Sequence, residues 1–173
     1  MGVRSSRAFE LEWLQLVGEL YRKPVIPLGM FPPPPTQDIT GHEAALEWLD
    51  GQTTLRSIVI LAHGSVGGFL THAGLDSITE GLAGGIRLVL LPLLFDQGLN
   101  ARLLVDKKVA IEVARDEEDV AAALRRVMVE DEGKELGAKV RELAEVLGSD
   151  EVNDQCVRDF LRCLSDYSSQ QQG

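Results

Sequence analysis

The sequence is poor in cysteine, in basic residues and in long apolar stretches, and each shortage removes a class of function. Its 173 residues include two cysteines, and 17 Lys and Arg stand against 27 Asp and Glu, which gives a formal net charge of −10. Nucleic-acid phosphates demand a basic face, and an anionic membrane surface attracts one too. We therefore expect neither a nucleic acid nor a membrane as partner.

The few cysteines and the short apolar runs also indicate a compartment. Cys156 and Cys163 lie seven residues apart in a predicted helix, a separation of roughly 10 Å that excludes a mutual disulfide. The longest apolar run, residues 88–95, contains Pro92 and is too short to span a bilayer. Residues 1–9 lack the apolar stretch of a signal peptide. We expect a cytoplasmic protein with free thiols.

Strand-like and helix-like segments alternate after Gly51, over the length of one ordinary domain. Such alternation implies parallel strands joined by right-handed crossovers. The predicted fold is α/β, a partial parallel sheet with flanking helices and an all-helical C-terminal segment. The predicted strands are 58–62, 68–71, 87–91 and 109–113, and the predicted helices are 78–83, a segment within 96–108, 117–131, 132–147 and 151–167.

A different organisation is predicted before Gly51. Residues 8–22 carry apolar side chains at helical spacing, and the KPVIPLGMF stretch after them is extended because its prolines block a helix. The PPPPTQDITGHE segment is typical of a stiff linker, and a short helix is predicted at 42–49.

The stretch GGFLTHAGLDSITEGLAGG places polar side chains around one predicted strand-to-helix turn. Ligands of parallel sheets bind beyond the carboxyl ends of the strands, at helix N-termini. Gly74 allows close approach to the backbone, His72 can donate to a diphosphate, and Ser77 can cap the helix or donate to a phosphate oxygen. Glu80 can accept both hydroxyls of a ribose. The pattern suggests a nucleoside diphosphate site, with an ordinary N-capped helix as the alternative.

Residues 63–98 resemble the plant secondary-product signature box of the UDP-glycosyltransferases. The matching features, spaced without gaps, are His63, the run VGGFLTH, Gly74, Ser77, Glu80, Pro92 and the pair Asp96-Gln97. The flanking stretches KPVIPLG, ALEWLDGQ and 100–133 resemble the family as well. That family has the GT-B fold, in which two Rossmann-like domains face a cleft. The resemblance is strongest to the branch that extends sugars on flavonoid, saponin and terpenoid glycosides, including soyasaponin rhamnosyltransferase-like members.

The resemblance implies transfer of a sugar from a UDP-sugar to a hydroxyl of a plant secondary metabolite or its glycoside, without a metal or other cofactor. It implies an interdomain helix and proline-rich linker at 1–40 and an incomplete C-terminal UDP-sugar-binding domain, Rossmann-like, at 41–167. Residues 168–173 are expected to form a disordered tail. In the family, His72 would hold the diphosphate, Ser77 the α-phosphate, Glu80 the ribose, and Asp96 with Gln97 the donor sugar. The expected UDP-sugar-binding set is His72, Gly74, Asp76, Ser77, Glu80, Asp96 and Gln97.

The sequence also departs from the family pattern. Thr54 and Ser57 stand where the family carries the Trp and Gln that hold the uracil, and Leu75 replaces another Trp. Asp76 replaces an Asn, which sets a carboxylate beside the expected diphosphate. At about 5 Å and an effective dielectric constant of ~20, that charge opposes a phosphate by roughly 3 kcal/mol. We expect weak binding of a UDP-sugar, if any.

The stretch WLDGQTTLRSIVILAHGS matches both the first strand of the family's C-terminal domain and the start of the box, so the chain is expected to omit several βα units. Neither His42 nor His63 lies in the context of the family's catalytic His, and no catalytic residue is assigned. An acceptor would bind only in a full-length enzyme, and the isolated chain is expected to transfer no sugar. The alternatives are a donor-binding half of such an enzyme and a truncated, catalytically inactive remnant. A flavodoxin-like binding protein is a third alternative, which the length of the match disfavours.

Overall fold

The computed structural model describes residues 1–32, 44, 47, 57–58, 66–113 and 120–170. The chain forms two compact units, one made of Met1–Phe31 and Glu145–Gly173 and the other of Pro32–Ala144. The first unit therefore joins segments from both ends of the sequence. Most of the proline-rich linker lies outside the described residues, and so do almost all of the helix predicted at 42–49 and most of the strand predicted at 58–62.

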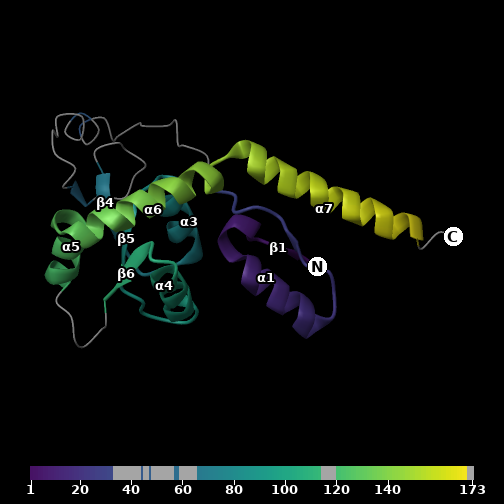
Figure 1. The fold of residues 1–173 in the computed structure, drawn as a ribbon, viewed down its shortest axis with the longest axis horizontal. Helices are drawn as coiled ribbons and strands as arrows, with labels where there is room; N and C mark the ends of the chain where they lie inside the picture. Colours follow the sequence, from purple (N-terminus) through teal and green to yellow (C-terminus); the bar gives the residue numbers. More distant parts are fainter. Residues whose placement is uncertain (33–43, 45–46, 48–56, 59–65, 114–119, 171–173) are drawn as a thin grey trace. The chain divides into compact units, whose positions relative to one another are not determined.

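The central unit is built on four parallel strands in the order β3-β4-β5-β6 (Figure 1). The strands are β3 (Ser57–Ile58), β4 (Val66–Thr71), β5 (Arg87–Leu90) and β6 (Ala110–Glu112). The helices are α3 (Leu75–Ala83), α4 (Gln97–Asp106), α5 (Val120–Val129) and α6 (Asp131–Leu147), of which residues 145–147 belong to the other unit. The predicted α/β fold with a parallel sheet is confirmed, and so is the helical segment that follows it.

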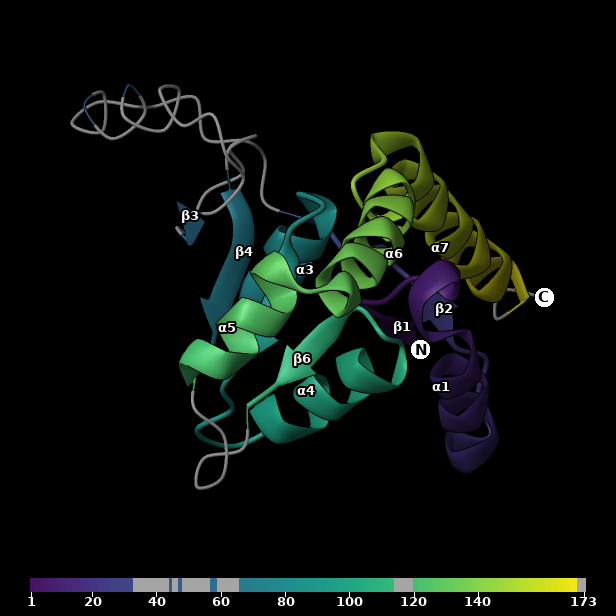
Figure 2. The same ribbon diagram turned by 60° about the vertical axis from the view of Figure 1, so that its left-hand side comes forward.

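The sheet lies between two helical layers because successive side chains of its strands point to opposite faces. Phe69 and Leu88 are register partners on one face, where Leu88 packs so closely on α3 that a Cβ at Gly81 would lie 2.7 Å from its Cδ2. On the other face, Val89 packs in one cluster with Val127 of α5 and Leu136 of α6, all buried. Figure 2 shows α5 in front of the sheet and α3 behind it. An apolar strand such as β5 is buried on both faces, as its sequence predicts.

A glycine of β4 allows the close approach of α5. A Cβ at Gly68 would lie 2.8 Å from the sulfur of Met128, so a larger residue there would displace the Met128 side chain of α5. Gly68 therefore serves the packing of α5 against the sheet.

The other unit contains β1 (Gly2–Val3), α1 (Arg7–Tyr21), β2 (Ile26–Pro27) and α7 (Asp150–Gln170). Strands β1 and β2 pair in parallel. Their pairing was not predicted, because strands of two residues have no readable periodicity. Helix α7 ends three residues beyond the predicted 167, so residues 168–170 of the expected tail are helical.

Side chains fasten this unit locally. The Ser6 hydroxyl caps α1 by accepting from the Ala8 N–H at 3.3 Å, and the Asn153 Oδ1 of α7 accepts from the Met30 N–H at 3.0 Å. Both cysteines of α7 are free, as their spacing predicts. Burial raises the pKa of the Cys156 thiol, with a further contribution from the charge of Asp159.

Candidate functional site

The two groups of predicted site residues lie at the same edge of the sheet. His72 follows β4 and Asp96 follows the loop after β5, and β4 and β5 are parallel neighbours. The Leu91 N–H donates to the Thr71 carbonyl at 2.8 Å, so the two strands end level with each other. Ligands of parallel α/β sheets bind at this carboxyl edge. The structure therefore brings the predicted phosphate and sugar residues to one place.

The turn after β4 is strained and tightly built. Ala73 has φ 66°, a left-handed conformation that costs a non-glycine residue about 1–2 kcal/mol, and it is fully buried. The exposed imidazole of His72 folds over Gly74, where a Cβ would lie only 2.6 Å from Nε2. Backbone strain of this kind is concentrated at functional sites. Gly74 is thus needed for the position of His72, as well as for the predicted access to the backbone.

Helix α3 begins at this turn without a side-chain cap. Its N-cap is Gly74, and the first intrahelical bond runs from the Ile78 N–H to the Gly74 carbonyl at 3.0 Å. The backbone N–H groups of the first turn lie before that bond, at the start of the helix. Ser77 lies in the first turn and not at the N-cap, so its predicted capping role is wrong. The positive end of the helix dipole favours an anion here.

Two carboxylates lie on one face of α3. Asp76, which is exposed, and Glu80, which is half-buried, are four residues apart and therefore neighbours along the helix surface. Ser77 is three residues before Glu80 and shares that face. The Thr79 hydroxyl is turned inward and donates to the Leu75 carbonyl at 2.8 Å. This face presents the Ser77 hydroxyl and the Asp76 carboxylate in the first turn and the Glu80 carboxylate one turn later. The two oxygens of Glu80 can accept from a pair of hydroxyls.

The loop after β5 is held by Gln97. Its Oε1 accepts from the N–H groups of Leu93 and Leu94, both at 2.9 Å, which leaves its amide nitrogen as the donor group for a ligand. Asp96 occupies the N-cap position of α4, but its carboxylate makes no capping bond. Its Oδ2 instead accepts from the Asn100 side chain at 3.2 Å.

Asn100 is a residue of this site that sequence reasoning missed. Its Nδ2 also donates to the Ala73 carbonyl at 3.1 Å, so one amide group links the turn after β4 with the start of α4. The spacing of four residues from Asp96 on a predicted helix could have indicated the contact within α4. No sequence signal pointed to the contact with Ala73, which lies 27 residues earlier.

A group of exposed apolar side chains borders Asp96 and Gln97. Among them, Phe95 is 93% exposed in a left-handed conformation with φ 54°, and Leu99 is 67% exposed. Leu93 and Leu94 of the preceding loop are exposed too. Apolar surface gathered in this way is typical of a face that contacts another molecule or domain.

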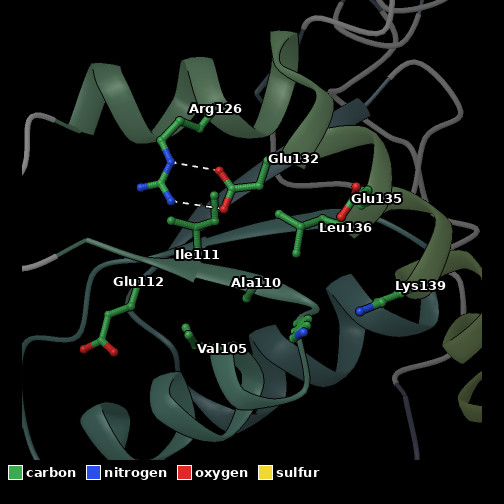
Figure 3. Close-up of a pocket in the computed structure, with 10 residues that line it drawn as sticks. Val105, Ala110, Ile111, Glu112, Arg126, Glu132, Glu135, Leu136 and Lys139 are labelled. Carbon is green, nitrogen blue, oxygen red and sulfur yellow. Dashed lines mark hydrogen bonds and ion pairs between the residues drawn. The ribbon is translucent and has the colours of Figure 1, made fainter.

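A separate pocket of about 350 Å³ lies along β6, outside the predicted site. Figure 3 shows Arg126 and Glu132 facing each other there across two hydrogen bonds, from Nε at 3.0 Å and from Nη2 at 3.1 Å. None of the seven predicted site residues lines this pocket. Within the described residues, no group of three or more His, Cys, Asp and Glu side chains is placed to hold a metal ion. No described helix is both long and apolar enough to cross a membrane.

Comparisons with known proteins identify the family of the chain. The sequence model of the family described as "UDP-glucoronosyl and UDP-glucosyl transferase" matches residues 48–144. The chain is 31% identical to UDP-glycosyltransferase 91C1 of Arabidopsis thaliana over 239 residues, which cover 96% of the chain and 52% of the relative. It is 37% identical to soyasaponin III rhamnosyltransferase of Glycine max over 132 residues, covering 72% of the chain and 27% of that protein.

The fold has solved counterparts. One is the structure of Phytolacca americana UGT2 complexed with UDP-2fluoro-glucose and pterostilbene, which superposes with a TM-score of 0.75 at 21% sequence identity. The superposition covers 96% of the present chain and 53% of the UGT2 chain. The chain thus spans about half the length of its relatives. The match to the Arabidopsis relative extends over 239 residues, whereas the chain has 173. Part of the matched stretch of the relative therefore has no counterpart in the chain, which fits the expected omission of several βα units.

Proposed function

The chain belongs to the UDP-glucoronosyl and UDP-glucosyl transferase family, and from this premise we propose that it is the donor-binding half of a UDP-glycosyltransferase. The full enzyme would transfer a sugar from a UDP-sugar to a hydroxyl of a plant secondary metabolite or its glycoside. The observation that carries the proposal is the meeting of the 72–80 segment and the Asp96-Gln97 pair at one carboxyl edge of the sheet.

The diphosphate end of the donor would lie at the turn after β4. His72 donates from its imidazole, Ser77 donates from its hydroxyl, and the N-terminus of α3 supplies backbone N–H groups and a positive partial charge. Gly74 keeps the space beside the His72 ring open. Each hydrogen bond to a phosphate is charge-assisted and contributes about 1.5–3 kcal/mol.

The ribose and the donor sugar would continue along two different elements. Glu80, one turn into α3, accepts from the two ribose hydroxyls through its two carboxylate oxygens. Asp96 accepts from a sugar hydroxyl, and the amide nitrogen of Gln97 donates to another. The Phytolacca americana structure, which holds UDP-2fluoro-glucose, supports a donor of this chemical class for the fold.

The affinity for this donor would be low. The Asp76 carboxylate lies in the first turn of α3, where it opposes a diphosphate through charge repulsion. The position at which the family stacks the uracil holds Thr54, which is outside the described residues. A lost stacking contact weakens binding by about 1–3 kcal/mol. The Asp76 carboxylate and the missing stacking residue both affect binding of the nucleotide part of the donor. The affinity for UDP itself therefore measures both effects.

The chain alone would catalyse no transfer. An acceptor hydroxyl must lose its proton during attack, and the seven donor-site residues include no group assigned as the base for that proton. In the full enzyme, the catalytic base and the acceptor pocket would belong to the half of the relatives that has no counterpart in this chain. The exposed apolar group beside Asp96 would face that part.

Calorimetric titration with UDP tests the proposal, with Glu80→Ala as the variant that removes the ribose acceptor. We expect saturable binding to the wild type and weaker binding to the variant. The second candidate, a truncated and inactive remnant, is favoured by the relative's unmatched residues. It predicts no titratable heat from UDP in either protein. Release of UDP from UDP-glucose with a flavonoid or saponin glycoside present would contradict the expected inactivity of the isolated chain.

A further inference from the structure

We propose that Asn100 is a positioning residue that fastens the turn after β4 to the start of α4, and so sets the distance between the two ends of the donor site. The inference deepens the proposed function and rests on it. Asn100 would not itself contact the donor. It would act through Ala73, which precedes Gly74 in the phosphate turn, and through Asp96, which is assigned to the sugar.

The hydrogen bonds of Asn100 use the whole donor capacity of its side chain. The amide nitrogen carries two hydrogens, and it donates one bond to the Ala73 carbonyl at 3.1 Å and one to Asp96 Oδ2 at 3.2 Å. The backbone N–H of Asn100 also donates to the Asp96 carbonyl at 3.0 Å. The side chain is half-buried, so water competes with these bonds less than at the surface.

The turn that Asn100 holds needs an external restraint. Ala73 keeps a left-handed conformation with φ 66°, and a strained conformation persists only where its surroundings enforce it. The backbone bond between Leu91 and Thr71 fixes the ends of the strands, but it comes before the turn. Beyond it, the Asn100 amide is the side-chain group that joins this turn to α4 within the described residues.

A UDP-sugar would contact both the turn after β4 and the loop before α4, so its binding depends on the distance between them. The diphosphate and the sugar of a UDP-sugar are joined covalently, so a ligand can use His72 and Asp96 together only if the two loops are correctly separated. UDP lacks the sugar and needs the turn after β4 alone. Loss of the link should therefore weaken binding of a UDP-sugar more than binding of UDP. A residue that only stabilised the fold would weaken both equally.

The first test needs no ligand. Backbone amide NMR spectra are compared for the wild type, Asn100→Ala and Asn153→Ala. The last is a matched control that loses side-chain bonds to Met30, Leu147 and Ser149 in the other unit. We expect Asn100→Ala to shift the signals of both Ala73–Gly74 and residues 95–97, and the control to shift neither. Changes confined to α4 would overturn the proposal. If the alanine variant unfolds, Asn100→Asp takes its place, because it keeps the size of the side chain and removes the donor. We expect it to shift the same two groups of signals.

The second test compares the affinities for UDP and for UDP-glucose in the same proteins. We expect Asn100→Ala to shift their ratio against UDP-glucose by about three- to tenfold, the effect of losing one or two hydrogen bonds. Asn153→Ala should leave the ratio unchanged. An unchanged ratio in Asn100→Ala would contradict a positioning role. If the wild type binds neither ligand, the proposed function fails, and the amide spectra alone decide whether Asn100 couples the two loops.

Discussion

Substitution of Gly74 by alanine should separate the stability of the fold from the function of the site. The backbone of Gly74 has φ −69° and ψ 141°, which alanine adopts without strain. The new Cβ would lie 2.6 Å from His72 Nε2 and 3.4 Å from its two neighbouring ring carbons. The ring must therefore retreat by roughly 1 Å to reach ordinary contact distance. It can do so, because the His72 side chain is exposed.

The two consequences differ in size. The fold should lose about 1 kcal/mol, since alanine is a clearly poorer N-cap than glycine. Binding of UDP should weaken by about 1.5–3 kcal/mol, the contribution of one hydrogen bond to a charged group, because the displaced imidazole no longer reaches the diphosphate. That loss corresponds to roughly 10- to 150-fold in the dissociation constant.

The assay combines thermal unfolding with calorimetric titration of UDP, and it includes a double-mutant cycle with His72→Ala. If Gly74→Ala acts through the ring, adding it to His72→Ala should cost little further affinity. Gly98→Ala is the matched control, because among the described residues a Cβ there meets Arg102 Nη2 alone, at 3.9 Å. It should leave UDP binding unchanged. Undiminished binding by Gly74→Ala, or additive losses in the cycle, would refute the role assigned to His72.

Further predictions concern the charge beside the phosphates, the packing of two helices and one strained residue. Asp76→Asn should tighten UDP binding by about 1 kcal/mol and lose that gain in high salt, whereas equal titrations for both proteins would show that no phosphate lies near Asp76. Gly133→Ala should destabilise the fold by about 3 kcal/mol in denaturant unfolding, because its Cβ would overlap the Val127 carbonyl group, and a wild-type midpoint would contradict this packing. Lys108→Gly should raise the free energy of unfolding by about 1 kcal/mol, because it relieves a left-handed φ of 57°. The same change at Lys107, where φ is −73°, should lower the free energy of unfolding.

The parts of the fold that are set by local patterns could be predicted from the sequence. The run at 87–91 became β5 because an apolar strand buried on both faces has a continuous apolar sequence. The alternation of strands and helices likewise predicted parallel pairing. Strands β1 and β2 could not be predicted, because each has two residues and is recognised as a strand only through its pairing with the other. The clustering of both chain ends in one unit is also set by distant contacts.

The candidate site shows the same division. Its residues could be named from the box, and their positions at one edge followed from the parallel topology. The start of α3 was misjudged at Ser77, because a serine and a glycine can both begin a helix and the chain uses Gly74. The strain at Ala73 carries no sequence signal, since alanine seldom adopts a left-handed conformation. The link through Asn100 depends on a contact between two elements and was invisible for that reason.

The most direct test of a retained donor site is to map bound UDP-glucose by backbone amide NMR on the wild-type chain. We expect saturable shifts in two places, at residues 72–80 and at residues 96–97, and with UDP we expect the first group alone. Shifts that cluster along β6, around Arg126 and Glu132, would place the ligand in the other pocket. That result, or the absence of saturable shifts at millimolar nucleotide, would contradict the account.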